Sequence, residues 1–240
     1  MSSRTRAIIA LLGLAGGLGV ACTAGTTITG SGRIVATPGP TAPFNKIEVS
    51  SAFDVTVGIA HEQSVMLHVD DNLVDRLDVA VSNETLHIGL KPGSAVRNAT
   101  FRASVTATAL AGITISGASN VYLTKALTGH SIDVTESGAS RLYGSLQVGS
   151  STLEMSGASN AILTGSADHV TATVSGASKL TADRLRANNL TIDLSGASSA
   201  AVNVTGTISA GASGLSTLTY VGNPTFTRKE VSGASAIAPA

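Results

Sequence analysis

Aromatic residues and cysteine are scarce in this chain of 240 residues, which has no tryptophan, three tyrosines, four phenylalanines and one cysteine. With Cys22 as the single thiol, no disulfide can form within the chain, so stability must come from packing and backbone hydrogen bonds. The shortage of aromatic rings also disfavours a sugar-binding site of the usual ring-lined kind. The formal net charge at pH 7 is zero, and no basic cluster indicates a nucleic-acid partner.

Glycine, by contrast, is abundant, and much of it belongs to an internal repeat. The tetrapeptide Ser-Gly-Ala-Ser begins at Ser116, Ser137, Ser156, Ser175, Ser195 and Ser232. A variant, Ala-Gly-Ala-Ser at 210–213, fills the gap between the last two copies. Steps of about 20 residues indicate a solenoid, in which each coil buries its apolar face against its neighbours.

Apolar and polar residues alternate on both sides of each tetrapeptide. Before the first copy this pattern is Ile113, Thr114, Ile115, and it resumes afterwards at Val121 and Leu123. Period-2 alternation indicates strands with one buried face, and no segment has the 3.6-residue period of a helix. The sequence therefore predicts an all-β fold, a parallel β-helix (β-solenoid) with coils of about 20 residues, which we expect to be right-handed. Each tetrapeptide should form a corner between strands, with its alanine facing inward.

One residue conflicts with this pattern. The alternation places Glu136 inward, between Ile115 and Met155 of the neighbouring coils. A buried carboxylate without a partner is costly. We expect a β-bulge in this coil to turn Glu136 towards solvent, and the alternative is a buried acid with a functional role.

The N-terminus has the features of a bacterial lipoprotein signal. Arg4 and Arg6 precede an apolar run at 7–20, and Leu-Gly-Val-Ala at 18–21 leads to Cys22. This resembles a lipobox, and it predicts a signal peptide at 1–21 and acylation of Cys22, including palmitate. Residues 22–43, rich in Thr, Gly and Pro, are interpreted as a flexible tether.

The remaining residues, 44–240, are predicted to form one solenoid domain. Alternation at 47–49, 53–59, 65–69, 77–81, 86–90 and 101–105 indicates strands without the tetrapeptide. Their irregular spacing suggests that 44–110 forms larger, less uniform coils that cap the regular repeats of 111–240.

Short motifs in this domain resemble those of a bacterial envelope family, the putative auto-transporter adhesins with a head GIN domain. They are Phe-Asn-Lys-Ile-Glu-Val at 44–49, Phe-Asp-Val-Thr-Val at 53–57, Asp-Asn-Leu at 71–73, Leu-His-Ile at 86–88 and Ile-Thr-Ile-Ser-Gly-Ala-Ser at 113–119. The resemblance implies a parallel β-helix on the cell envelope, often in a lipoprotein, and it assigns no catalytic residue.

Parallel β-helices also include polysaccharide lyases and hydrolases, so carboxylates on an outer face need examination. The best candidates are Glu154, Asp193 and Glu230, three residues before their glycines. Glu154 and Asp193 should lie two coils apart, about 10 Å, which exceeds the separation in retaining glycosidases. The histidines at 61, 68, 87, 130 and 169 form no metal-binding motif. We therefore predict no catalytic residue, no metal and no cofactor.

Outward polar and aromatic residues after the corners predict a recognition surface instead. Tyr122 and Tyr143 lie five residues past their glycines, so they should stack on adjacent coils. A polar row runs beside them. The predicted binding face consists of Asn120, Tyr122, Arg141, Tyr143, Asn160 and Lys179.

These observations favour a non-enzymatic lipoprotein of the cell envelope, anchored by lipid to the outer face of a bacterial membrane. It would present a rigid solenoid for adhesion or for binding a surface protein, carbohydrate or polymer, and not nucleic acid. The alternative is a β-helix enzyme, a lyase or hydrolase, acting on a polysaccharide. No amphipathic helix follows the last repeat to cover its coil, so we also expect weak self-association through unpaired strand edges.

Overall fold

The computed structural model describes residues 27–240, which form strands, connecting turns and one short 3₁₀ helix. Cys22, the predicted signal peptide and the start of the predicted tether lie outside the described residues. Within 27–240 no helix is long and apolar enough to cross a lipid bilayer. The elements are β1 (Ile28–Thr29), β2 (Ile34–Pro38), β3 (Lys46–Val49), β4 (Asp54–Ile59), β5 (Ser64–Asp70), η1 (Asp71–Arg76), β6 (Leu77–Ser82), β7 (Thr85–Leu90), β8 (Val96–Arg97), β9 (Phe101–Ala107), β10 (Gly112–Ile115), β11 (Asn120–Leu123), β12 (Leu127–Glu136), β13 (Arg141–Met155), β14 (Asn160–Val174), β15 (Lys179–Leu194), β16 (Ser199–Ala212), β17 (Thr217–Val221), β18 (Thr225–Val231) and β19 (Ala236–Pro239).

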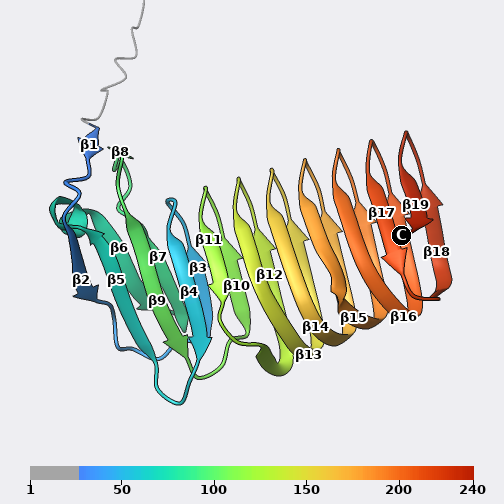
Figure 1. The fold of residues 1–240 in the computed structure, drawn as a ribbon, viewed down its shortest axis with the longest axis horizontal. Coiled ribbons are helices and arrows are strands. Elements are labelled where there is room, and N and C mark those ends of the chain that lie inside the picture. The colour runs from blue at the N-terminus through green and yellow to red at the C-terminus, as the bar shows by residue number, and fades with distance from the viewer. Residues whose placement is uncertain (1–26) are drawn as a thin grey trace, which may run out of the picture.

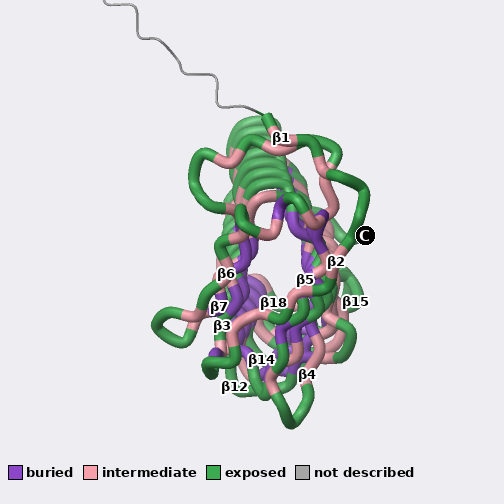
Figure 2. Tube along the Cα trace, turned by 90° about the vertical axis from the view of Figure 1, so that its left-hand side faces the viewer, coloured by how far each residue is buried: buried purple, intermediate pink, exposed green. Residues whose placement is uncertain are grey.

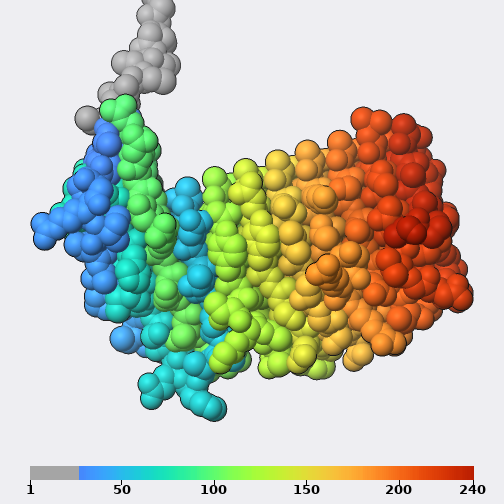
Figure 3. Space-filling model, viewed as in Figure 1, coloured from blue at the N-terminus to red at the C-terminus, as the bar shows by residue number. Residues whose placement is uncertain are grey.

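The strands stack into a β-solenoid of about seven turns, which confirms the predicted fold class. Strands β13 to β16 each run from just after one corner to just before the next. Each pairs in parallel with the strand one coil on. The coils advance along the long axis, with the corners in a row along one edge (Figure 1). The space-filling view shows them as adjoining ridges (Figure 3).

Each corner depends on a glycine with a left-handed backbone. Gly117, Gly138, Gly157, Gly176, Gly196, Gly214 and Gly233 all have φ between 69° and 77°. A side chain would also collide with the coil below, since a Cβ on Gly157 would lie 2.6 Å from the carbonyl oxygen of Gly138. That carbonyl accepts a hydrogen bond from the amide of Ala158, so consecutive corners bond to each other.

The sixth corner is not where the tetrapeptide alignment places it. Gly214 has the positive φ, whereas Gly211 lies inside β16, paired with Asp193. The corner is therefore Ser-Gly-Leu-Ser at 213–216, and with Gly214 in place the corner glycines are more evenly spaced than the tetrapeptide alignment implies. The alignment on Gly211 was wrong because Ala-Gly-Ala-Ser and the true corner, Ser-Gly-Leu-Ser, each differ from the consensus at one position, and the alignment followed the former.

The inward residue of each corner is the second serine, not the alanine. Ala118, Ala139, Ala158 and their successors are exposed, and Leu215 takes this position in the sixth corner with 67% exposure. The buried ladder consists of Ser119, Ser140, Ser159, Ser178, Ser198 and Ser216. Two of its steps are hydrogen-bonded, with 3.0 Å between the Oγ atoms of Ser159 and Ser178 and 3.3 Å between those of Ser198 and Ser216.

Apolar side chains fill the rest of the interior. Figure 2, looking along the solenoid, shows buried residues lining the two long walls of the coil from inside. Ladders such as Ile113, Val134, Leu153, Ala172 and Ile192 stack one residue per coil, each less than 3% exposed. The chain therefore has a continuous, mostly aliphatic core although it contains few aromatic residues.

The N-terminal part combines parallel coils with antiparallel strands, and its order in space differs from its order in sequence. Strands β3 and β4 pair in parallel with β10 and β11 on one side and with β7 and β9 on the other. Beyond them, β5 pairs antiparallel with β9, and β6 with β7. The expected irregular coils are thus partly antiparallel, and they cover one end of the solenoid.

The structure contradicts the expected tether for much of residues 22–43. Strand β2 pairs antiparallel with β5, and β1 pairs with β8, so the folded domain begins before residue 44. The Asp-Asn-Leu motif and the residue before it hold this segment. Asp70, which is 1% exposed, accepts hydrogen bonds from the amides of Gly32 and Thr100, and Asn72 Nδ2 donates to the carbonyl of Thr29 at 2.9 Å.

Candidate binding face

The six residues of the predicted binding face come together on the strands that follow the corners. Asn120, Arg141, Asn160 and Lys179 pair one above the next, because they occupy the same position in β11, β13, β14 and β15. Arg141 and Lys179 are exposed, while the two asparagines are half-buried between them. Stacked strands lie about 4.8 Å apart, so the side chains form a straight polar row.

The two tyrosines form the expected stack beside this row. Tyr122 and Tyr143 pair in register, with ring centroids 5.1 Å apart and an interplanar angle of 7°. Tyr122 is 40% exposed, so its ring is available to a partner. The stacked pair supplies a small apolar platform next to charged and amide groups.

The polar row continues into the N-terminal coils. Asn120 pairs with Asp54 and Asp54 with Arg102, and Asn120 Nδ2 donates to Asp54 Oδ1 at 2.6 Å. A shallow hollow of about 580 Å³ lies here, between Tyr122, Arg102 and His68. We call the extended surface the Arg141 face: Arg102, Asp54, Asn120, Tyr122, Arg141, Tyr143, Asn160 and Lys179.

Sequence reasoning missed Arg102 and Asp54 because their place depends on strand order. They lie on β9 and β4. Strand β4 pairs with β11, and β9 with β4, only because the N-terminal coils pair out of sequence order. Alternation identifies these strands but gives no signal for their partners.

The other wall carries the carboxylates considered for catalysis. We call this row the Glu154 face: Glu48, Thr114, Thr135, Glu154, Thr173, Asp193, Gly211 and Glu230. Arg228 donates a hydrogen bond to Asp193, and its Nη1 atom lies 3.4 Å from Glu230 Oε2. The hydrogen bond to Asp193 raises the pKa of Arg228. Two of the three candidate carboxylates are therefore engaged by one arginine. Residues 27–240 contain no group of three or more side chains suited to a metal ion.

Glu136 is the most unusual ionisable group of the described chain. It is fully buried and pairs in register with Ile115 and Met155, so the predicted bulge is absent and that prediction was wrong. Neither carboxylate oxygen has a close hydrogen-bond partner among residues 27–240. Burial raises the pKa of Glu136 to about 7, against a smaller lowering by the Ser140 hydroxyl. The parallel ladders on both sides hold the backbone in register despite this cost.

Several solved structures resemble this fold. A putative adhesin from Bacteroides fragilis is 23% identical, with a TM-score of 0.84 over 89% of this chain and 100% of its own. A putative adhesin from Parabacteroides distasonis is 19% identical, with a TM-score of 0.72 over 90% and 100%. A putative lipid binding protein from the same species is 15% identical, with a TM-score of 0.67 over 90% and 100%. At these identities the likeness establishes the shared fold. No curated protein matches the chain.

A family model gives the stronger evidence. The model of the putative auto-transporter adhesin, head GIN domain, matches residues 43–224, well over half of the chain. It spans both the N-terminal coils and most of the tetrapeptide repeats, and it confirms the resemblance carried by the short motifs. This coverage, together with the solenoid and its corner ladder, shows that the chain belongs to the family of putative auto-transporter adhesins with a head GIN domain.

Proposed function

We propose that this protein is a non-enzymatic component of the bacterial cell envelope that binds a surface polymer or partner through the Arg141 face. The adhesin family and the adhesins of similar fold fit a binding role and a surface or envelope location. The observation that carries the proposal is the row of polar side chains beside the stacked Tyr122 and Tyr143 rings.

The geometry suits binding better than catalysis. Parallel strands hold this row at a fixed repeat, so an extended ligand can meet the same kind of group on successive coils. Little backbone entropy is lost on binding, because the strands that carry these side chains belong to a continuous sheet with a packed core. The Glu154 face, by comparison, has two of its carboxylates tied to Arg228.

The proposal includes attachment by lipid at Cys22. The supporting evidence is in the sequence: a basic start, an apolar run at 7–20 and a lipobox-like segment directly before the single cysteine. Mass spectrometry of the mature protein should find an acylated N-terminal cysteine. A mature N-terminus at another residue, without lipid, would contradict the anchor and leave the binding role standing.

Binding is tested with a panel of glycans and cell-wall polymers. Every described strand lies in 28–239 and pairs within that range, so a chain starting at residue 22 with Cys22→Ser contains the whole fold. We expect saturable binding to at least one polymer, lost in the Tyr122→Ala/Tyr143→Ala double variant. Failure to bind any polymer, or release of cleaved sugar fragments, would contradict the proposed function.

A further inference from the structure

We propose that the Arg141 face binds an acidic polysaccharide whose sugar residues bear carboxylates. This inference rests on the proposed function and names the chemical class of its ligand. It is carried by the arrangement of cations, amides and rings on one wall, and by the opposite charge of the other wall.

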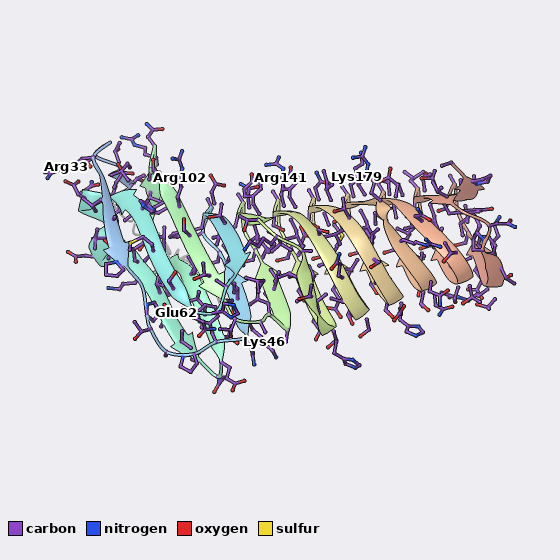
Figure 4. All side chains as sticks on the ribbon, turned by 60° about the horizontal axis from the view of Figure 1, so that its bottom comes forward. Arg33, Lys46, Glu62, Arg102, Arg141 and Lys179 are labelled. Carbon is purple, nitrogen blue, oxygen red and sulfur yellow. The ribbon has the colours of Figure 1, made fainter. Side chains whose placement is uncertain are left out.

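Three cations stand in one row on this face. In register order the row is Arg102, Asp54, Asn120, Arg141, Asn160 and Lys179. Figure 4 shows Arg102, Arg141 and Lys179 along the same side of the molecule. From the strand spacing, Arg141 lies about 14 Å from Arg102 and about 10 Å from Lys179. An extended chain with carboxylates at intervals can therefore reach successive cations.

These cations are free to meet an external anion. The ion pairs of residues 27–240 involve Arg33, His87 and Arg228, and none involves a cation of this row. Asp54, the one carboxylate of the row, accepts a hydrogen bond from Asn120 Nδ2 at 2.6 Å. With three cations and one carboxylate, the row has a net positive charge.

The negative charge of the Glu154 face disfavours binding of such a polymer to that wall. Glu48, Glu154, Asp193 and Glu230 occupy one row there, and the nearby Asp133 adds a further exposed carboxylate. Arg228 pairs with Asp193 and Glu230, and His87 lies 3.0 Å from Glu48, but the carboxylates on this wall still outnumber these partners. The remaining negative charge repels a polyanion, whereas the Arg141 face attracts it. Residues 22–240 contain 13 basic and 15 acidic side chains, so the net charge does not favour a polyanion and the separation of charge between the two walls supplies the selectivity.

The tyrosines favour a sugar polymer over a polyol phosphate. The faces of sugar rings carry C–H groups that pack on aromatic rings. The exposed Tyr122 ring lies two residues after Asn120 on β11, on the same face of the strand. The Arg141 guanidinium can bind a carboxylate through two parallel hydrogen bonds. Asn120 and Asn160 stand on either side of Arg141, and their Oδ1 atoms are buried, so the exposed cations and the Tyr122 ring supply the main contacts.

The test compares polygalacturonate with its methyl ester, which keeps the backbone but removes the charges. A polyribitol phosphate serves as the phosphate-bearing comparison. Binding to the Cys22→Ser chain is measured by calorimetry at two salt concentrations, for the parent, Arg141→Gln, Lys179→Gln and the control Glu154→Gln. Thermal melts confirm that each variant is folded. We expect binding to polygalacturonate alone, weakened by salt and about fivefold by either cation substitution, but not weakened by Glu154→Gln.

Other outcomes would overturn the inference. Equal binding of the methyl ester, binding of the phosphate polymer alone, or no effect of either cation substitution would each do so. If the polymer panel is positive while polygalacturonate fails, the inference is wrong and the proposed function stands. If the whole panel is negative, the proposed function fails as well.

Discussion

At the scale of single residues, the fold depends on a few positions where the backbone conformation or the solvation of the side chain is tightly restricted. Corner glycines permit the left-handed turn and the close approach of the next corner. The second serine of each corner packs inside, where its hydroxyl can bond along the ladder. Glu136 interrupts an apolar ladder, and its carboxyl group is buried without a close hydrogen-bond partner among the described residues.

The first prediction concerns a corner. Gly157→Val should lower the free energy of unfolding by about 3 kcal/mol or more, because Gly157 has a φ of 75° and a Cβ there would meet the backbone of Gly138. The matched change Ser159→Ala removes one buried hydrogen bond and should cost about 1 kcal/mol. Urea unfolding measures both. Equal stability of the glycine variant and the parent would refute the corner geometry.

The second prediction uses the pKa of Glu136, which burial raises from 4.5 to about 7. The folded state holds this proton more tightly than the unfolded state, so its contribution to stability falls as pH rises from about 4.5 to about 7 and is constant outside that window. The full difference is about 3 kcal/mol.

Glu136→Gln removes this titration and leaves the other carboxylates in place. The stability difference between parent and variant should therefore change by about 3 kcal/mol between pH 4 and pH 8, with the parent losing stability relative to the variant. Urea unfolding at the two pH values gives both differences. A pH-independent difference would show that Glu136 is solvated or ionised in the folded state.

At the scale of elements, alternation in the sequence predicts most strands but does not give their partners. The regular coils were predictable because each tetrapeptide fixes the register of its neighbours. The sixth corner was misplaced because the third position faces solvent and tolerates Leu215, so Ser-Gly-Leu-Ser departs from the consensus without structural penalty. A search for evenly spaced glycines, without regard to the residues around them, would have found Gly214.

The N-terminal elements were less predictable for a physical reason. Strand β3 pairs with β10, although β4 to β9 lie between them in the chain, and no local pattern encodes that choice. Residues 28–38 were expected to be flexible because Thr, Gly and Pro are common there, yet β2 is held by pairing with β5 and by Asp70. Tertiary contacts override composition in this segment.

The third prediction tests that attachment. Asp70→Ala should lower the free energy of unfolding by about 2 kcal/mol or more, because it leaves the amides of Gly32 and Thr100 without their acceptor. Hydrogen exchange of the β2 amides should become faster. Asp168→Ala, at an exposed position, is the control and should change neither quantity. Unchanged exchange in the Asp70 variant would show that other contacts hold the segment.

At the scale of the whole molecule, the protein is a rod with two walls of different charge and two different ends. Antiparallel strands cover the N-terminal end, while β18 and β19 each pair on one side only among the described residues. The continuous ladder makes the rod rigid, so groups on one wall keep a fixed spacing. Such a molecule suits presentation of a surface at a cell envelope.

The fourth prediction concerns the open edges of β18 and β19. Their free backbone groups and the half-exposed Val231 should support weak self-association of the Cys22→Ser chain. Analytical ultracentrifugation over a wide concentration range should show an average mass that rises with concentration. A constant monomer mass up to high micromolar concentration would exclude association through these edges.

A bulky label placed on one wall at a time shows which wall the polymer contacts. With Cys22 replaced by Ser the chain has no other cysteine, so one thiol can be introduced and coupled to a bulky maleimide. Asn160→Cys lies between Arg141 and Lys179, and Thr171→Cys lies on the other wall of the same strand, β14. Polygalacturonate binding is measured before and after coupling. We predict that the label at 160 abolishes binding and that the label at 171 leaves it unchanged. Loss of binding only with the label at 171, or unchanged binding with the label at 160, would contradict this prediction.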